Sequence, residues 1–261
     1  MRDYISVSQF NTYSRCQLQY YFRYILGLVV PPNQNMAVGT ATHSGVEYAY
    51  QSIWEDNKYL IGDCKDVARD SITNEGKVEW VDRDKAVDNS VSMVQAYSDA
   101  GYPNKVKQED IIGIEVKRSI VLVDKNGTVK PKLLGVADLV TENKVVDFKT
   151  SSKKQSKPDG YNYFQNSVYA YLFKVQKTEV HQMSYKKSGA EAVDYEVPIM
   201  PLPVLFNIVQ PFWNTLKYIE SLDWDKKDLI RKFNATGIMH SWACNYCGYG
   251  QSGICKHKME V

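Results

Sequence analysis

The stretch Gly135-Val-Ala-Asp-Leu-Val-Thr-Glu-Asn-Lys-Val-Val-Asp-Phe-Lys-Thr150 decides the fold of this chain. Two apolar runs rich in β-branched residues, 133–140 and 144–148, flank the short polar break Thr141-Glu142-Asn143. This pattern is typical of two strands joined by a tight turn. The sequence therefore predicts an antiparallel hairpin here.

Asp138 and Asp147 lie opposite each other if the turn is centred on residues 142 and 143. Side chains alternate along a strand, so Lys149 joins the two carboxylates on one face, while Val146 and Phe148 point into a core. Like charges directly opposite each other destabilise a sheet by up to about 1 kcal/mol. A divalent cation would remove that penalty, and Mg²⁺ and Mn²⁺ prefer such oxygen ligands. An edge hairpin with solvated charges is the alternative.

Length and composition indicate a soluble globular protein. The 261 residues are 44% hydrophobic and 24% charged, which suits one elaborated domain or two small ones. The sequence has no run of about 18 apolar residues, and its first residues lack the apolar region of a signal peptide. We expect a cytoplasmic protein of a bacterial, archaeal or phage-infected cell, with no membrane partner.

Charge is distributed unevenly along the chain. Residues 55–88 carry ten acidic against six basic side chains, whereas residues 142–187 carry nine lysines against four acidic side chains. A polyanion would be drawn to the second segment. A solvated surface is the alternative interpretation.

The order of the predicted elements is that of an α/β protein. A capping box of Ser6 and Gln9 begins the first helix, which an aromatic stripe extends to about residue 26. The further elements that we expect are a helix over 39–54, a helical part over 56–108, a strand over 110–123, an Asn126-Gly127 turn, a helix over 158–175, strands over 179–185 and 193–199, and a helix over 203–221.

Two helices carry polar pairs at a spacing of four residues, which places each pair on one helix face. His43 and Glu47 form the first pair, and small residues nearby (Gly39, Ala41 and Gly45) would let a ligand or another backbone approach closely. Gln165 and Tyr169 form the second pair. Glu115 would reach the metal from a neighbouring strand, and a solvated glutamate is the equal alternative.

Five cysteines are present, and three of them cluster near the C-terminus as Cys244-x₂-Cys247 and Cys255. Clustered cysteines in an intracellular protein favour a metal site over disulfides. Two thiolates at this spacing reach one metal, and the glycines between them and Cys255 let the third fold back. Cys16 is the candidate for a fourth ligand and Cys64 is the spare, although Cys16 by itself also fits a buried small side chain.

With all these residues in order, the chain resembles a RecB-type nuclease of the PD-(D/E)XK superfamily. It is most similar to the iron–sulfur branch, which includes CRISPR-associated RecB-like exonucleases and the AddB nuclease domain. The motifs that carry the resemblance are Ser6-x-Ser8 with Cys16, Gly39-x₃-His43, Gly135-x₂-Asp138, Asp147-x-Lys149, Gln165-x₃-Tyr169 and the terminal cysteines.

This resemblance implies one nuclease domain over residues 1–261 with a restriction-endonuclease-like core, a mixed sheet flanked by helices. The core would span 109–200, between a helical part at 1–108 and a cysteine segment at 201–261. It implies that Mg²⁺ or Mn²⁺ binds to His43, Asp138, Asp147 and the Phe148 carbonyl. Lys149 would assist the attacking water, and Gln165 and Tyr169 would position Lys149 or DNA. A [4Fe–4S] cluster would bind to Cys16, Cys244, Cys247 and Cys255.

The resulting hypothesis is a metal-dependent DNA exonuclease or end-processing nuclease that acts on single strands or DNA ends. The alternative is an iron–sulfur DNA-binding or assembly subunit of a recombination or CRISPR adaptation complex with little turnover of its own. Zn²⁺ on the four cysteines is a further alternative to iron. A homo-oligomer and partners from recombination, repair or CRISPR adaptation stay open.

Overall fold

The computed structural model describes residues 3–76, 78–123, 129–152, 157–235, 243–245 and 247–256. The chain forms two compact units that interleave in sequence. Unit 1 comprises Met1–Pro31, Ser119–Gly135 and Pro201–Val261, and unit 2 comprises Pro32–Arg118 and Val136–Met200. A single domain in three successive parts stays a prediction.

Three helices begin unit 2. They are α3 (Gln34–Asp56), α4 (Ile61–Asn74) and α5 (Arg83–Asp99), and the short η2 (Pro103–Lys105) and η3 (Gln108–Asp110) follow them. Helix α3 starts five residues before the predicted start because the Asn33 side chain accepts a hydrogen bond from the Met36 N–H at 3.0 Å. This side chain is an N-cap, which satisfies a donor that the first helical turn leaves unpaired.

Unit 2 contains a mixed sheet. Strand β3 (Val129–Thr141) enters it from unit 1, and β4 (Lys144–Ser151), β5 (Lys177–Lys186) and β6 (Gly189–Glu196) follow, with α6 (Gly160–Phe173) between β4 and β5. The pairs β3–β4 and β5–β6 are antiparallel and β4–β5 is parallel. Strand β2 (Ile111–Val123) also pairs with β3. The predicted α/β class, with a mixed sheet flanked by helices, is confirmed.

The register of the decisive hairpin follows the sequence prediction. Leu139 pairs with Val146 and Val140 pairs with Val145. The later pair of strands, β5 and β6, differs from its prediction in where β6 begins. A two-residue turn places Lys186 opposite Gly189, so β6 starts four residues before the expected position. The predicted turn at residues 126 and 127 lies outside the described residues.

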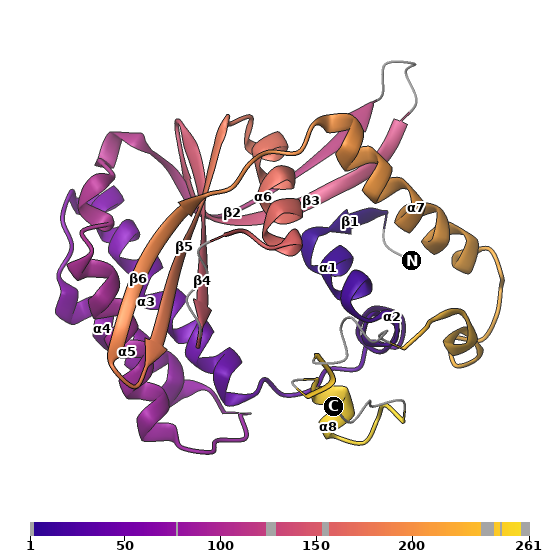
Figure 1. Cartoon of the computed structure of the whole chain (residues 1–261), viewed down its shortest axis with the longest axis horizontal. Coiled ribbons are helices and arrows are strands. Elements are labelled where there is room, and N and C mark those ends of the chain that lie inside the picture. The colour runs from indigo at the N-terminus through magenta and orange to yellow at the C-terminus, as the bar shows by residue number, and fades with distance from the viewer. Residues whose placement is uncertain are drawn as a thin grey trace. The chain divides into compact units, whose positions relative to one another are not determined.

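The two faces of β4 carry different chemistry. Phe148 is fully buried, and the ring of Tyr50 from α3 stacks on it with centroids 5.8 Å apart. Asp147 points to the other face, where Gln165 of α6 donates a hydrogen bond to it. Helices α3 and α5 therefore cover the apolar face and α6 the polar face (Figure 1).

Unit 1 is built around aromatic rings. Its elements are β1 (Tyr4–Ser6), α1 (Val7–Arg15), α2 (Gln17–Tyr20), the π-helical turn η1 (Tyr21–Ile25), α7 (Leu202–Glu220), η4 (Asp228–Lys232) and α8 (Gly248–Gln251). Strand β1 pairs in parallel with the first part of β3. The ring of Phe212 on α7 lies 4.7 Å from that of Tyr13 and 5.5 Å from that of Phe10, centroid to centroid.

The first helix differs from its prediction in one important place. The capping box is confirmed, because Gln9 N–H donates to Ser6 Oγ and Ser6 N–H donates to Gln9 Oε1. The helix, however, is interrupted at Cys16, whose backbone is extended at φ −160° and ψ 114°. Cys16 therefore lies between two helices and not inside one, because Leu18 N–H, in the next turn, is bound by the carbonyl of Asn234 at 3.1 Å.

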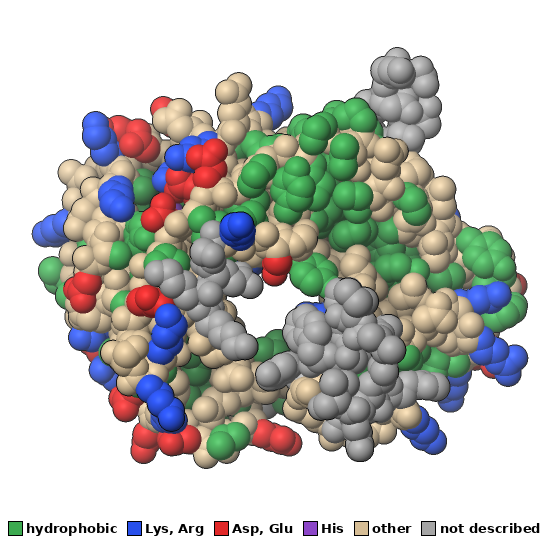
Figure 2. Space-filling view, viewed as in Figure 1, with side chains coloured by type: hydrophobic (Ala, Val, Ile, Leu, Met, Phe, Trp, Pro, Cys, Tyr) green, Lys and Arg blue, Asp and Glu red, His purple; other side chains and the backbone are tan. Residues whose placement is uncertain are grey.

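Figure 2 shows acidic and basic side chains interspersed over the visible face of α4, α5 and β6. The local excess of acidic residues in 55–88 thus does not form a separate acidic field on that face. Within the described part of the chain, no helix has the length and apolar character needed to cross a membrane.

Gly45 permits the close packing of α3 against α4 and α5. A Cβ at this position would lie 2.7 Å from the Cys64 carbonyl oxygen and 2.8 Å from Val94 Cγ2. We expect Gly45→Ala to lower the free energy of unfolding by about 1–3 kcal/mol through overpacking, despite the higher helix propensity of alanine. Urea unfolding monitored by circular dichroism measures this change.

Gly62 in α4 provides the matched control, because nothing lies within 4 Å of a Cβ built there. Gly62→Ala should leave stability unchanged or raise it by up to about 1 kcal/mol. Equal effects of the two substitutions would show that helix propensity, and not the contact with Cys64, governs position 45.

Candidate functional site

His43, Glu47 and Asp138 form a group that could hold a metal ion in unit 2. Their candidate ligand atoms all lie within 4.8 Å of one another. His43 Nδ1 is 3.9 Å from Glu47 Oε1 and 4.0 Å from Asp138 Oδ2. The predicted i, i+4 pair on α3 and the first hairpin carboxylate are therefore brought together. Asp147, also a predicted ligand, does not belong to this described group.

Asp138 is tied to the opposite strand by a backbone hydrogen bond. Its Oδ2 accepts from the Phe148 N–H at 2.5 Å. Leu139 and Val146 are the last pair that the structure describes between β3 and β4. Beyond this pair, the Phe148 N–H is satisfied by the Asp138 side chain. A buried backbone donor needs such a partner, and this one fixes the Asp138 carboxylate beside β4.

Asp147 is held by two polar side chains. Its Oδ2 lies 2.7 Å from Lys149 Nζ, and its Oδ1 accepts from Gln165 Nε2 at 2.5 Å. Gln165 Oε1 also accepts from Lys149 Nζ at 3.3 Å, and Gln165 Nε2 contacts the Tyr169 hydroxyl at 3.0 Å. All four residues singled out from the Asp-x-Lys and Gln-x₃-Tyr motifs thus form one network.

Burial dominates the electrostatics of these ligands. It lowers the pKa of His43 to about 4, with a smaller contribution from the charge on Lys149. Burial, followed by the charge on Asp147, raises the pKa of Asp138 well above its usual value. Burial also raises the pKa of Asp147, although Lys149 opposes the shift. A neutral imidazole and carboxylates whose charge is only partly compensated are suited to bind a cation.

Lys149 supplies the positive charge that this site needs. Burial alone would lower its pKa, but the charges on Asp147 and then Asp138 outweigh burial and raise it. Lys149 is therefore an ammonium at neutral pH, and it partly neutralises the two carboxylates. Burial and the same two carboxylates raise the pKa of Tyr169 well above its usual value, so its hydroxyl stays protonated.

Glu47 and Glu115 share the edge of the site. Burial, the charge on Glu115 and a hydrogen bond between the two carboxyl groups raise the pKa of Glu47 to about 7. Glu115 has a positive φ of 52° inside β2, a conformation that costs energy for a residue with a side chain. The hydrogen bond between Glu115 and Glu47 is a contact that the regular alternation of the strand did not indicate.

Phe148 is enclosed by residues that the sequence did not single out. Tyr50 stacks on the ring, and the hydroxyl of Tyr97 lies 2.8 Å from that of Tyr50 and 2.7 Å from His181 Nδ1. His181 Nε2 is 3.2 Å from Glu179 Oε2. Tyr50 lies seven residues after His43, a helical spacing that could have revealed it, whereas nothing local connects Tyr97 to His181.

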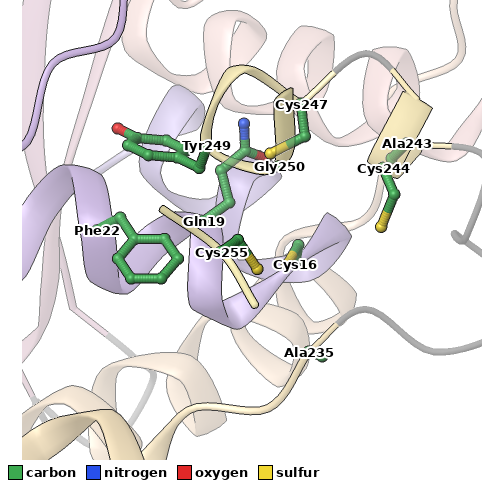
Figure 3. Close-up of a pocket in the computed structure, with 10 residues that line it drawn as sticks. All are labelled: Cys16, Gln19, Phe22, Ala235, Ala243, Cys244, Cys247, Tyr249, Gly250 and Cys255. Atoms are coloured by element: carbon green, nitrogen blue, oxygen red, sulfur yellow. The ribbon is translucent and has the colours of Figure 1, made fainter. Parts of the chain in front are cut away.

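The four cysteines of the predicted cluster line one pocket in unit 1. Cys16, Cys244, Cys247 and Cys255 are all half-buried there. Figure 3 shows their side chains around this pocket. Cys64 is fully buried in unit 2, where burial raises the pKa of its thiol to about 11. The structure therefore brings these four cysteines to one pocket and leaves Cys64 elsewhere, while their role as ligands stays a prediction.

Short contacts hold the cysteine segment against the first helices. The Tyr249 hydroxyl donates to the Leu28 carbonyl at 2.6 Å, and its ring lies 5.3 Å from that of Phe22. A Cβ at position 248 would lie 2.7 Å from Val30 Cγ2, so any other residue there would force the Val30 side chain to move. These contacts place α8 next to the break at Cys16.

Residues 4–256 match the family described as the PD-(D/E)XK nuclease superfamily. The chain belongs to the PD-(D/E)XK nuclease superfamily. No curated protein matches the sequence. A solved structure described as "Crystal structure of SSO0001" is similar with a TM-score of 0.40 and 16% sequence identity over 94% of this chain and 96% of that chain.

Membership of the PD-(D/E)XK superfamily confirms the coarse part of the sequence prediction. PD-(D/E)XK nucleases depend on divalent metals, and DNA is the substrate that this nuclease fold implies. The group of His43, Glu47 and Asp138 agrees with a metal site in such a protein.

The raised pKa of Glu47 predicts a pH-dependent stability of the metal-free protein. Because the folded-state pKa of about 7 exceeds the ordinary value of 4.5, the folded state binds this proton more tightly. The resulting stability is present below pH 4.5 and is lost as the pH rises through about 7. Glu47→Gln removes this loss, so the variant should gain up to about 3 kcal/mol relative to wild type across that range.

Urea unfolding in EDTA at about pH 4.5 and pH 8 measures this difference. EDTA matters because a bound cation would stabilise the charged form of Glu47 in wild type. If the difference between variant and wild type were the same at both pH values, the proposed shift of Glu47 would be wrong.

Proposed function

We propose that this protein is a Mg²⁺- or Mn²⁺-dependent DNA exonuclease or end-processing nuclease. The observation that carries the proposal is the network of Asp147, Lys149 and Gln165 next to the group of His43 and Asp138. An ammonium and two carboxylates on the neighbouring strands β3 and β4 supply both a cation site and a group that can orient water.

The donor set of the site fits a hard divalent cation. His43, Asp138, Asp147 and the Phe148 carbonyl oxygen are the groups that would hold it, with Glu47 next to His43 as a further oxygen ligand. Burial makes the charges of Asp138 and Asp147 costly, and a bound cation would offset this cost. The cation would act as a Lewis acid that offsets negative charge developing on the phosphodiester.

Lys149 is the residue that we assign to the attacking water. Its ammonium contacts Asp147 Oδ2 and Gln165 Oε1, and these two contacts fix its position. Cation binding would weaken the hold of both carboxylates on this ammonium and so make its proton easier to lose. Gln165 and Tyr169 are positioning residues, because they fix the orientations of Asp147 and Lys149.

The preference for single strands or DNA ends is supported by the resemblance to RecB-type nucleases. Within that group the motifs Gly39-x₃-His43 and Gln165-x₃-Tyr169 accompany the Asp-x-Lys motif, as they do in this sequence. Recombination, repair and CRISPR adaptation are the processes in which such an activity is used.

We further propose that the cysteine pocket holds a [4Fe–4S] cluster. Its four thiols are the complete ligand set of such a cluster, and they come from two ends of the sequence. The other lining side chains are mostly apolar, namely Phe22, Ala235, Ala243 and Tyr249. Zn²⁺ would need the same number of thiolates, so the metal has to be determined by measurement.

The nuclease proposal predicts that Asp147→Ala and Lys149→Ala abolish cleavage while sparing DNA binding. Removal of a cation ligand or of the group that acts on water should lower the rate at least about 100-fold. End-labelled single- and double-stranded DNA, incubated with anaerobically purified protein and Mg²⁺ or Mn²⁺, reports both cleavage and end preference.

Glu142→Gln is the matched control, because Glu142 is an exposed carboxylate at the turn of the same hairpin. This variant should cleave like wild type, and EDTA should stop both. Cleavage that survives Asp147→Ala would contradict the mechanism. Absence of cleavage from wild type, with DNA binding intact, would favour the alternative of a binding or assembly subunit.

The cluster proposal predicts iron and sulfide in anaerobically purified protein, together with a visible absorption band. Cys247→Ala should lose both the iron and the band. Cys64→Ala should keep them, since Cys64 is buried in the core of unit 2. Colourless protein that contains zinc would contradict the assignment of iron, because Zn²⁺ has a filled d shell.

A further inference from the structure

Phe148 joins the candidate ligand His43 to a set of buried aromatic side chains. The imidazole of His43 lies edge-on against the Phe148 ring, with centroids 6.0 Å apart and planes at 87°. Tyr50, on the same helix as His43, stacks on this ring with centroids 5.8 Å apart. Tyr97 of α5, which covers the same face of the sheet as α3 (Figure 1), contacts the ring edge-on at 5.8 Å. The orientation of His43 therefore depends on how firmly the Phe148 ring is held.

A chain of hydrogen bonds holds the two tyrosine rings. The hydroxyls of Tyr50 and Tyr97 are 2.8 Å apart, and the Tyr97 hydroxyl is 2.7 Å from His181 Nδ1. His181 Nε2 lies 3.2 Å from Glu179 Oε2. All four side chains are buried, so water competes little for these hydrogen bonds.

Glu179 sets the direction of the chain at one end. Lys144 and Lys177 both contact its carboxylate. Burial would raise the pKa of Glu179, but hydrogen bonds from His181, Lys144 and Lys177 outweigh burial and lower the pKa. An ionised carboxylate only accepts hydrogen bonds, so His181 Nε2 carries a proton and donates it to Glu179.

The neutral form of His181 sets the direction of the remaining hydrogen bonds. Burial lowers the pKa of His181, and Glu179 opposes this shift only in part, so the ring is uncharged at neutral pH. Its Nδ1 is then an acceptor, and the Tyr97 hydroxyl donates to it. The Tyr97 oxygen in turn accepts from the Tyr50 hydroxyl. Each hydroxyl in the chain thus has a defined partner, which fixes the orientation of both tyrosine rings.

We propose that His181 and Tyr97 are positioning residues for the metal site, which they keep assembled through Tyr50 and Phe148. This inference rests on the proposed function, in which His43 and the Phe148 carbonyl bind the cation. Groups that contact the ligands of a metal fix the orientation of those ligands, and their loss typically weakens metal binding about 10- to 100-fold. The described group of candidate ligands contains neither His181 nor Tyr97.

A purely structural role of the buried tyrosines is the competing explanation. Tyr102 provides the matched comparison, because its ring lies 5.0 Å from that of Tyr97 and 4.6 Å from that of His181, centroid to centroid. Its hydroxyl donates to Asp194 Oδ1 at 2.8 Å and so lies outside the chain. Tyr97→Phe and Tyr102→Phe each remove one hydroxyl and keep the ring. If these tyrosines only stabilised the core, both variants would unfold more easily and neither would alter the cation affinity of the folded protein.

The experiment is an anaerobic titration of the full chain with Mn²⁺, in which electron paramagnetic resonance measures the free ion. The temperature is one at which circular dichroism shows every variant to be folded. Tyr97→Phe should weaken Mn²⁺ binding about tenfold, whereas Tyr102→Phe should stay within about twofold of wild type. Asp138→Asn identifies the site, because this variant should lose it.

Two substitutions of His181 test the direction of the chain. The amide of asparagine takes the place of Nδ1, and that of glutamine takes the place of Nε2. His181→Asn therefore keeps an acceptor for the Tyr97 hydroxyl and gives up Glu179, which retains Lys144 and Lys177. His181→Gln keeps the contact with Glu179 and offers no acceptor to Tyr97. His181→Gln should bind Mn²⁺ about tenfold more weakly than wild type, with His181→Asn between the two.

Three results would overturn the proposal: an unchanged affinity in Tyr97→Phe, an equal loss in Tyr102→Phe, or tighter binding in His181→Gln than in His181→Asn. Wild-type protein with no Mn²⁺ site that Asp138→Asn abolishes would overturn the proposed metal site itself and this inference with it. The wild-type titration therefore distinguishes the two failures.

Discussion

The compensation of two buried carboxylates is the constraint on which unit 2 depends. Asp147 is 1% exposed and Asp138 is held against the Phe148 N–H, so neither charge is freely solvated. An uncompensated charge in such a place would cost several kcal/mol. Lys149 and Gln165 supply the compensation from the polar face of β4, and α6 has to lie over that face to bring Gln165 there. Removal of any one partner therefore leaves the others unsatisfied.

Rigid packing on the opposite face turns this compensation into a defined geometry. Phe148 is clamped by Tyr50 and Tyr97, and the hydroxyls of these tyrosines continue to His181 through two short hydrogen bonds. Helix α3 carries both Tyr50 and His43, so the clamp that holds β4 also fixes the imidazole next to Asp138. The close approach of α4 at Gly45 keeps α3 in place. The backbone that joins the candidate metal ligands is thus held from both sides.

The sequence predicted those parts of the site whose geometry is local. The alternation of Asp147, Phe148 and Lys149 determined which side chains share a face, and the spacing of four residues placed His43 beside Glu47. Helix periodicity failed at Cys16, because aromatic residues continue at helical spacing through a break that depends on a contact with Asn234. Local patterns contain no information about such a partner, which lies more than 200 residues away in sequence.

The positive φ of Glu115 escaped the sequence analysis for a related reason. Glutamate has no intrinsic preference for that conformation, so the surrounding packing must impose it. The buried chain from Tyr97 to His181 likewise joins segments that no spacing rule connects. By contrast, the spacing of Cys244, Cys247 and Cys255 indicated three thiols that can approach one another, and the structure places them around one pocket together with Cys16.

The cysteine pocket also explains how a short C-terminal segment stays on the first helices. The described hydrogen bond of Tyr249 with Leu28 contributes only about 0.5–1.5 kcal/mol, and the ring contact with Phe22 adds a similar amount. Ordering each backbone residue costs about 1–2 kcal/mol, so these two contacts by themselves offset the ordering of only a few residues. Ligation of the proposed metal or cluster by Cys16 and the three later cysteines would supply free energy on a larger scale. The glycine at position 248 and the break at Cys16 would then both help two distant segments present their thiols to that proposed group.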